Sequence, residues 1–142
     1  MTDPWSPLAK DSVDAVLASI AFDTAGLVPA IAQQHDTGEI LMVAWMSRAA
    51  IRETLTSRTA VYWSRSRMQL WRKGETSGQT QRLVDFLVDC DGDTVLLKID
   101  QTGVACHTGR RSCFYRSARS SGLEIVASVL ADPGALYRTG KA

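Results

Sequence analysis

Three cysteines and one histidine are the residues of this chain whose types and spacing best suit metal chemistry. Cys106 follows Cys90 by sixteen residues, Cys113 follows Cys106 by seven, and His107 stands next to Cys106. A catalytic zinc ion takes three protein ligands and keeps one position open, and thiolates are among its preferred ligands. We therefore interpret the three cysteines as zinc ligands and His107 as the acid/base catalyst. The alternatives are that His107 is a fourth ligand, or that the cysteines are simply buried apolar residues.

Aspartates flank the first of these cysteines in the run Asp89-Cys90-Asp91-Gly92-Asp93. Three carboxylates so close together repel one another unless a cation neutralises them, and oxygen ligands suit Mg²⁺. If the chain stays extended here, the three carboxylates share one side of a strand, opposite Cys90. The run therefore indicates a magnesium site beside the zinc site, with a solvated acidic hairpin tip as the alternative.

A basic and aromatic stretch at residues 62–78 has the composition of a nucleotide-binding surface. Arginine binds phosphate through paired N–H groups, hydroxyls add further donors, and aromatic rings stack on bases. A second basic pair follows His107, and two separate basic clusters would suit a ligand with two phosphates; the alternative is an ordinary solvated strand face with core tryptophans. The candidate ligand-binding residues are Trp63, Ser64, Arg65, Arg67, Lys73, Glu75, Thr76, Ser77, Gly78, Arg110 and Arg111.

Hydrophobic periodicity predicts the elements that must position these residues. Helical spacing predicts one helix near residues 12–20, capped by Asp11 or Ser12, and another over residues 48–57, capped by Ser47. Strand-like runs bounded by turn residues predict the remaining elements. These predicted strands are 27–33, 39–45, 60–65, 69–73, 81–90, 94–100 and a final core strand at 113–116.

Length and charge exclude several classes of protein. The 142 residues are the length of one domain. A net charge of +1 lacks the basic excess of a nonspecific nucleic-acid binder. The longest apolar run is seven residues, 40–46, whereas a membrane span needs about 20. We expect a single domain with an irregular arm at 1–10 and a tail at 117–142, without nucleic-acid or membrane partners. Because three cysteines suit reduced thiols, we expect a cytoplasmic location.

Several motifs, in order along the chain, resemble those of the phosphoribosyl-AMP cyclohydrolase family of histidine biosynthesis, in its monofunctional form. They are YWSRSR, LWRKGETSG, DCDGD and ACHTGRRSCFYR, preceded by GLVPAIAQ and TGEILMVAWM, which resemble the opening hairpin of the family. The resemblance covers residues 26–116. It departs at Gln79, where many members have a histidine; glutamine forms hydrogen bonds but does not take up a proton.

The resemblance implies a fold, a reaction and cofactors. The implied fold is α+β and β-dominated, a small, strongly bent mixed sheet (a pseudobarrel) with flanking helices. The implied reaction is hydrolytic opening of the purine ring of 1-(5-phosphoribosyl)-AMP at the N1–C6 bond, by zinc-activated water. Carried over by position, zinc falls on Cys90, Cys106 and Cys113, and Mg²⁺ falls on Asp89, Asp91 and Asp93. The resemblance also implies a homodimer with active sites at the subunit interface.

Two other functions stay open at this point. The first is a noncatalytic nucleotide-binding module with a structural zinc ion, which would have four protein ligands and no exchangeable water. The second is a zinc deaminase-like enzyme, which would release ammonia, although the usual deaminase signature is absent from the sequence.

Overall fold

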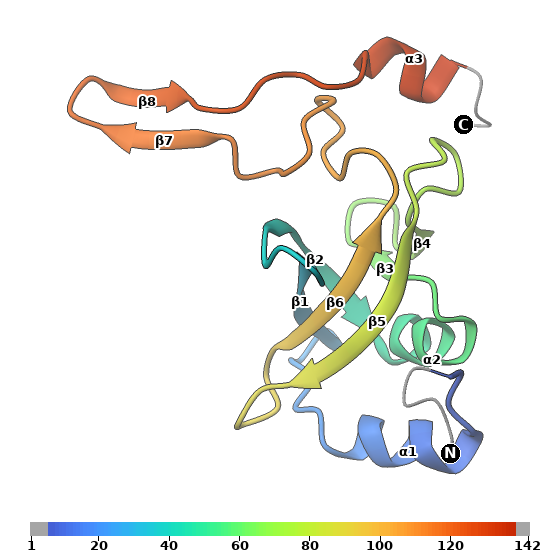
Figure 1. The fold of residues 1–142 in the computed structure, drawn as a ribbon. Helices are drawn as coiled ribbons and strands as arrows, with labels where there is room; N and C mark the ends of the chain where they lie inside the picture. The colour runs from blue at the N-terminus through green and yellow to red at the C-terminus, as the bar shows by residue number, and fades with distance from the viewer. Residues whose placement is uncertain (1–5, 139–142) are drawn as a thin grey trace.

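The computed structural model describes residues 6–138, and its centre is a strongly curled, six-stranded mixed sheet (Figure 1). The strand order is β4-β3-β2-β1-β6-β5; β1 and β6 are parallel, and all other neighbours are antiparallel. This architecture confirms the predicted fold class, and these strands lie within a few residues of the predicted ranges. Their bounds are β1 (Leu27–Gln34), β2 (Ile40–Ser47), β3 (Val61–Ser64), β4 (Gln69–Arg72), β5 (Gln81–Val88) and β6 (Val95–Gln101).

The turn between β1 and β2 shows why the first hairpin was predictable. Gly38 has φ +81°, a left-handed conformation that glycine adopts without steric cost. The backbone N–H of Gln34 donates to the carbonyl of Glu39 at 2.8 Å, and this bond closes the turn. The antiparallel register that follows brings Ala30 opposite Ala44 and so orders the centre of the sheet.

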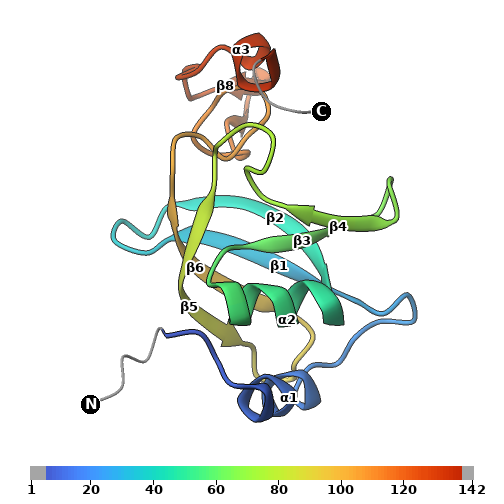
Figure 2. The same cartoon turned by 90° about the vertical axis from the view of Figure 1, so that its right-hand side faces the viewer.

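Two helices cover the inner side of the sheet. Figure 2 shows α2 (Arg48–Ser57) in front of the strands, with α1 (Lys10–Ala18) beneath it. The predicted cap of α2 is confirmed, because the hydroxyl of Ser47 accepts a hydrogen bond from the backbone N–H of Ala50 at 3.2 Å. The predicted cap of α1 is wrong: Ala9 is the N-cap and makes no side-chain bond, so this helix begins slightly earlier. No helix within residues 6–138 is long and apolar enough to cross a membrane.

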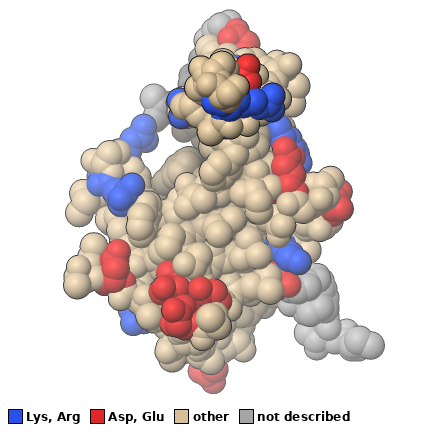
Figure 3. Space-filling view, turned by 90° about the vertical axis from the view of Figure 1, so that its left-hand side faces the viewer, with Lys and Arg blue, Asp and Glu red and all other residues tan. Residues whose placement is uncertain are grey.

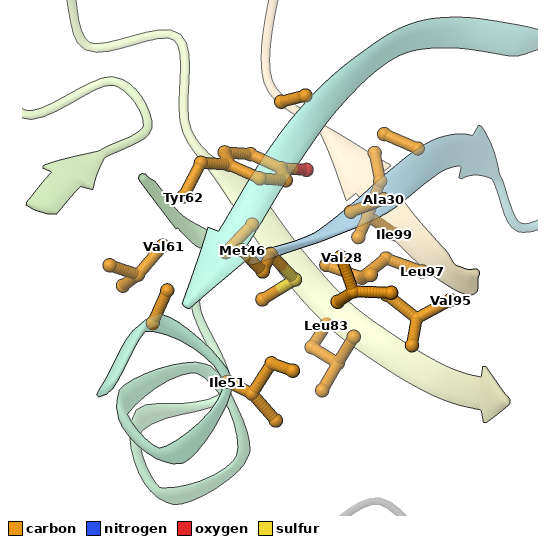
Figure 4. Close-up of a cluster of buried hydrophobic side chains, with 14 of the residues drawn as sticks. Val28, Ala30, Met46, Ile51, Val61, Tyr62, Leu83, Val95, Leu97 and Ile99 are labelled. Atoms are coloured by element: carbon orange, nitrogen blue, oxygen red, sulfur yellow. The ribbon is translucent and has the colours of Figure 1, made fainter. Parts of the chain in front are cut away.

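The core lies between the helices and the concave side of the sheet (Figure 4). Every second residue of β1, β2 and β6 faces inward, as strand alternation requires, and α2 contributes Ile51 from the opposite side. The central buried residues are Val28, Ala30, Met46, Ile51, Val61, Tyr62, Leu83, Val95, Leu97 and Ile99.

Buried polar side chains connect this core to the loop that precedes β5 and the loop that follows β6. The Tyr62 hydroxyl donates to Gln81 Oε1 at 2.6 Å, and Gln81 Nε2 donates to Gln101 Oε1 at 2.8 Å. Gln101 Nε2 in turn donates to the backbone carbonyl of Thr102 at 2.8 Å. A buried network whose members all have partners fixes the geometry of the groups it joins. The loop after β6 therefore starts from a rigid position.

Beyond β6 the chain leaves the sheet, and the predicted core strand at 113–116 is wrong. Cys113 and Phe114 are exposed and lie outside any strand. The strands that follow, β7 (Arg116–Arg119) and β8 (Gly122–Ile125), pair with each other in a separate hairpin that projects from the body (Figure 1). A strand needs a partner for its backbone groups, and the partner of this segment lies downstream rather than in the core.

The C-terminal segment contains more structure than its sequence indicated, whereas the described part of the N-terminal arm is irregular as expected. The expected tail contains the β7–β8 hairpin and a short helix, α3 (Pro133–Arg138). Of the expected N-terminal arm, residues 6–9 form no helix or strand. Residues 1–5 and 139–142, the remaining parts of the arm and the tail, lie outside the described residues.

Candidate active site

The loop after β6 brings two of the three cysteines together. The N–H of Cys106 donates to the carbonyl of Arg110 at 3.1 Å, which closes residues 106–110 into a tight turn. The N–H of Cys113 donates to the carbonyl of Leu41 at 2.7 Å, which fixes the end of the loop on β2. The side chains of Cys106 and Cys113 lie close enough for each to shift the pKa of the other. We call these two residues the thiol pair.

The two thiols of the pair differ in acidity. Burial acts to raise the pKa of Cys106, but hydrogen bonds from the side chain and backbone of Thr108 and from Cys113 bring that pKa below its ordinary value. Although Cys113 as a whole is exposed, partial burial of its thiol, together with the charge of Cys106, raises the pKa of Cys113 to about 12. Of the two thiols, Cys106 therefore loses its proton first. A metal cation that binds both thiols would displace the remaining proton from Cys113. The part played by Thr108 was not predicted, since a lone threonine carries no sequence signal for it.

A buried lysine lies beside the thiol pair. Lys73 is only 6% exposed, and its Nζ donates to the carbonyl of Ala105 at 2.7 Å. Burial lowers the pKa of Lys73, while the negative charges of Cys113 and Cys106 act in the opposite direction. The ammonium group that the sequence suggested for ligand binding is thus directed at the segment that carries Cys106.

A cavity of about 620 Å³ lies between the β3–β4 hairpin, the loop after β4 and His107. The structure brings seven of the predicted site residues together around it: Ser64, Arg67, Lys73, Glu75, Thr76, Ser77 and His107. Gln69, which sequence reasoning missed, also lines it, as do Ser66 and Trp71, which belong to the basic and aromatic stretch but were not among the candidate ligand-binding residues. Hydroxyls, an exposed arginine, an aromatic ring and an imidazole around one cavity fit a polar aromatic ligand.

A second cavity of about 530 Å³ adjoins the first, because the two share Ser64, Ser66 and Trp71. Trp63 and Arg65, both predicted to bind ligand, lie here rather than in the first cavity. The guanidinium group of Arg65 lies 4.6 Å from the centre of the Trp45 ring, and Trp45 pairs with Trp63 across the sheet. The predicted basic and aromatic residues are thus divided between two connected spaces.

The two remaining predicted arginines, Arg110 and Arg111, make contacts that restrain the loop that carries the thiol pair. Arg110 lies 4.1 Å from the centre of the Tyr115 ring and donates to the carbonyl of Ala127 at 2.9 Å. Arg111 forms an ion pair with Glu39 at 3.2 Å. Both guanidinium groups therefore have partners within the chain, and neither lines the two cavities described above.

Gln79, the position of the departure from the family pattern, joins two loops. Its Oε1 accepts from the N–H of Val104 at 2.9 Å, and its Nε2 donates to the carbonyl of Ser77 at 3.1 Å. Gly78, with φ +80°, lies in the same turn and donates its N–H to the carbonyl of Gly74. The glutamine thus ties the cavity loop to the segment that precedes Cys106.

The third cysteine lies in the acidic tip, residues 89–93, which joins β5 to β6. One ligand atom each from Asp89, Cys90 and Asp91 lies within 4.8 Å of the others. Within residues 6–138, this is the only cluster of three such side chains. The expectation that Cys90 faces away from the carboxylates is wrong, because the chain turns here instead of staying extended.

The carboxylates of the acidic tip share hydrogen bonds. Bonds from Asp93 and Asp89 lower the pKa of Asp91, and the same contacts with Asp91 and Asp89 raise the pKa of Asp93. Gly92 has φ +78°, and a Cβ there would overlap the carbonyl of Ser19 at the end of α1. The acidic tip is therefore packed against α1 and presents its oxygens as a preformed group.

The acidic tip and the thiol pair occupy opposite ends of β6 (Figure 1). The seven residues of β6 span roughly 20 Å at about 3.3 Å per residue. A zinc ion holds its sulfur ligands at about 2.3 Å. The thiol pair suits two positions of a zinc site, but Cys90 of the same chain cannot supply the third.

Comparison with known proteins places the chain among the cyclohydrolases, a class of hydrolytic enzymes. The sequence model of phosphoribosyl-AMP cyclohydrolase matches residues 42–115. The chain is 66% identical over 124 residues to the phosphoribosyl-AMP cyclohydrolase of Paramagnetospirillum magneticum, which covers 87% of this chain and 94% of that protein. Its identity to the proteins of the same name from Alkalilimnicola ehrlichii and Rhodospirillum centenum is 58% and 59%, over 92% and 90% of this chain and 92% and 96% of theirs. The chain therefore belongs to the phosphoribosyl-AMP cyclohydrolase family.

Proposed function

We propose that this protein hydrolyses the N1–C6 bond of the purine ring of 1-(5-phosphoribosyl)-AMP, a step of histidine biosynthesis. The observation that carries the proposal is the cavity that places His107 opposite the basic loop and next to the thiol pair. The family to which the chain belongs indicates this substrate, and the cavity contains polar and aromatic groups that suit it. Because metal binding needs reduced thiols, we place the reaction in the cytoplasm.

The two adjoining cavities suit the two arms of this substrate. Each arm ends in a phosphate, and Arg67 and Arg65 lie in different cavities. The shared residues Ser64 and Trp71 offer a hydroxyl and a ring between them. Binding at both ends orients the purine ring and holds its C6 in one place, which lowers the entropic part of the barrier.

His107 is the residue that moves the proton in this proposal. It takes a proton from the attacking water and returns it to N1 as the N1–C6 bond breaks. One water is consumed, the amino group stays on C6, and no ammonia forms. A zinc ion held by the three cysteines would lower the pKa of a bound water and so make hydroxide available near neutral pH. The acidic tip supplies oxygen ligands of the kind that Mg²⁺ prefers.

The zinc site is complete only if a second copy of the chain supplies Cys90. Within one copy, the thiol pair and Cys90 are separated by the length of β6. In a twofold dimer, each copy can present its acidic tip to the thiol pair of the other, so that two equivalent sites form. We therefore propose a homodimer with the active sites at its interface.

The outer face of the sheet supports this dimer. We use this name for Leu87, Leu96, Ile31 and Val43, which are successive neighbours across β5, β6, β1 and β2 and alternate with the core residues. This apolar row is not covered within one copy of the chain: Val43 is 51% exposed and Leu87 is 39% exposed. An apolar row on both sides of a sheet indicates that both sides are covered.

The charges at the two ends of this side complement each other. Figure 3 shows a broad uncharged surface between an acidic patch below and charged residues above. The acidic patch corresponds to the lower end of β5 and β6 in Figure 1, and the β7–β8 hairpin with Arg116 and Arg119 lies at the upper end. That hairpin also exposes Leu123 and Ile125. In a twofold dimer, the acidic patch of one copy would meet Arg116 of the other, whereas Arg119 is already paired with Glu124 of its own hairpin.

The proposed reaction has a direct test. The purified protein, supplied with Zn²⁺ and Mg²⁺, is incubated with 1-(5-phosphoribosyl)-AMP while ultraviolet absorbance and ammonia are measured. We expect the absorbance to change as the ring opens, with no release of ammonia. Ammonia would instead indicate a deaminase. An unchanged spectrum at full metal occupancy would indicate a noncatalytic nucleotide-binding module.

The proposed dimer predicts a large effect of one charge on the outer face. We expect Val43→Asp to raise the dimer dissociation constant at least about 100-fold, because an uncompensated carboxylate would be buried in each copy. Sedimentation velocity measures the change, and turnover should fall with the dimer fraction. Thr56→Asp, on the exposed side of α2, adds the same charge and should leave the dimer intact. A dimeric Val43→Asp protein would show that the interface lies elsewhere.

A further inference from the structure

Lys73 is the only lysine or arginine that is buried within the described residues. A buried charge is costly unless it has hydrogen bonds and an opposite charge nearby. The ammonium group has one hydrogen bond, to the carbonyl of Ala105, and no carboxylate partner within residues 6–138. The nearby groups that become negative when they lose their protons to a metal are the thiols of Cys113 and Cys106.

We propose that Lys73 is a positioning residue for the thiol pair, whose buried ammonium group fixes the backbone before Cys106 and offsets the negative charge of the metal-binding thiolates. This inference rests on the proposed zinc-dependent function. It assigns Lys73 a role that differs from the phosphate contact suggested by the basic composition of its loop.

The first argument for this role is the direction of the hydrogen bond. Ala105 directly precedes Cys106, so the 2.7 Å bond from Lys73 Nζ restrains the residue that carries the more acidic thiol. Lys73 itself is held by its backbone N–H, which donates to the carbonyl of Ala60 at 3.2 Å. The lysine thus links the sheet to the metal-binding loop.

The second argument is charge. Three thiolates on one dication leave a net charge of −1, which is unfavourable in a partly buried site. Other cations in this region have different partners: Arg72 pairs with Glu53, and Arg111 pairs with Glu39. Arg110 contributes charge to Cys106, but its guanidinium group lies over Tyr115. Lys73 is a buried cation that interacts electrostatically with both thiols and donates its hydrogen bond to the residue before Cys106.

The test measures zinc affinity rather than turnover. Full-length protein variants are titrated against a chromophoric chelator, and Co²⁺ substitution reports the sulfur-to-metal charge-transfer band. We expect Lys73→Met to weaken zinc binding about 10–100-fold, as loss of a group that supports a metal ligand usually does. Lys73→Arg keeps the charge and should recover most of the affinity. Arg67→Met, which removes an exposed cation of the same cavity, should raise KM and leave zinc affinity unchanged.

Lys73→Gln is a second variant that tests the inference even if the Lys73→Met protein does not fold. Glutamine can still donate to the carbonyl of Ala105 but carries no charge, so we expect a folded protein with weakened zinc binding. Wild-type zinc affinity in folded Lys73→Met or Lys73→Gln protein would overturn the inference, and a raised KM alone would make Lys73 a phosphate ligand. Failure of the proposed function is distinguishable, because the wild-type protein would then bind zinc without opening the purine ring.

Discussion

A mixture of two inactive variants, Cys90→Ser and Cys106→Ser, should regain about a quarter of the wild-type activity when the two are coexpressed. Each variant alone should lose about a thousandfold in turnover, because hydroxide is no longer supplied at neutral pH. In a mixed dimer, the intact Cys90 of one copy meets the intact thiol pair of the other, so one of the two sites is complete. Half of the dimers are mixed, and steady-state turnover with zinc content measures the recovery.

The control for this experiment is a mixture of two variants that both alter the thiol pair and leave Cys90 intact. Cys106→Ser and Cys113→Ser both alter the thiol pair, so every dimer that they form lacks an intact pair. This mixture should stay inactive. If Cys90→Ser and Cys106→Ser also fail to complement one another after verified exchange of subunits, the shared site is wrong.

Replacement of His107 should separate proton transfer from metal binding. We expect His107→Ala to retain zinc and to lose about 10²- to 10⁴-fold in kcat, the usual contribution of a general acid/base. His107 lines the cavity but is not needed for the contact between Cys106 and Cys113. The measurements are kcat, KM and zinc content.

His35 provides a matched control for that variant. It is the other histidine of the chain and lies exposed in the turn after β1. His35→Ala should therefore leave kcat and zinc content at wild-type values. Loss of zinc from His107→Ala would identify His107 as a metal ligand and would remove the argument for its role in proton transfer.

The parts of the fold that follow from local chemistry were predictable from the sequence. Ser47 caps α2 because a hydroxyl can bond the free N–H groups at a helix start, whatever the rest of the fold. The hairpin between β5 and β6 follows from Asp91-Gly92, since Gly92 takes the left-handed conformation of the turn. The cavity residues around Ser64 and Thr76 also lie close together in the chain, which made their grouping predictable.

The parts that depend on distant contacts were not predictable. Spacing along the chain grouped Cys90 with Cys106, but it contains no information about the seven-residue strand that separates them. The residues at 113–116 have strand-like side chains, yet Cys113 bonds to the start of β2 and the chain then leaves the sheet. The role of Lys73 likewise depends on its three-dimensional position next to Ala105, which is thirty-two residues away.

The parallel pairing of β1 with β6 affects how the chain can fold during synthesis. β1 and β2 can form their hairpin as soon as they leave the ribosome, but Ala30 pairs with Val95, which is made sixty-five residues later. Until then, one edge of β1 has unpaired backbone groups that other nascent chains could bond. Because β6 is synthesised late, the growing protein is most exposed to aggregation in the period before β6 completes the sheet.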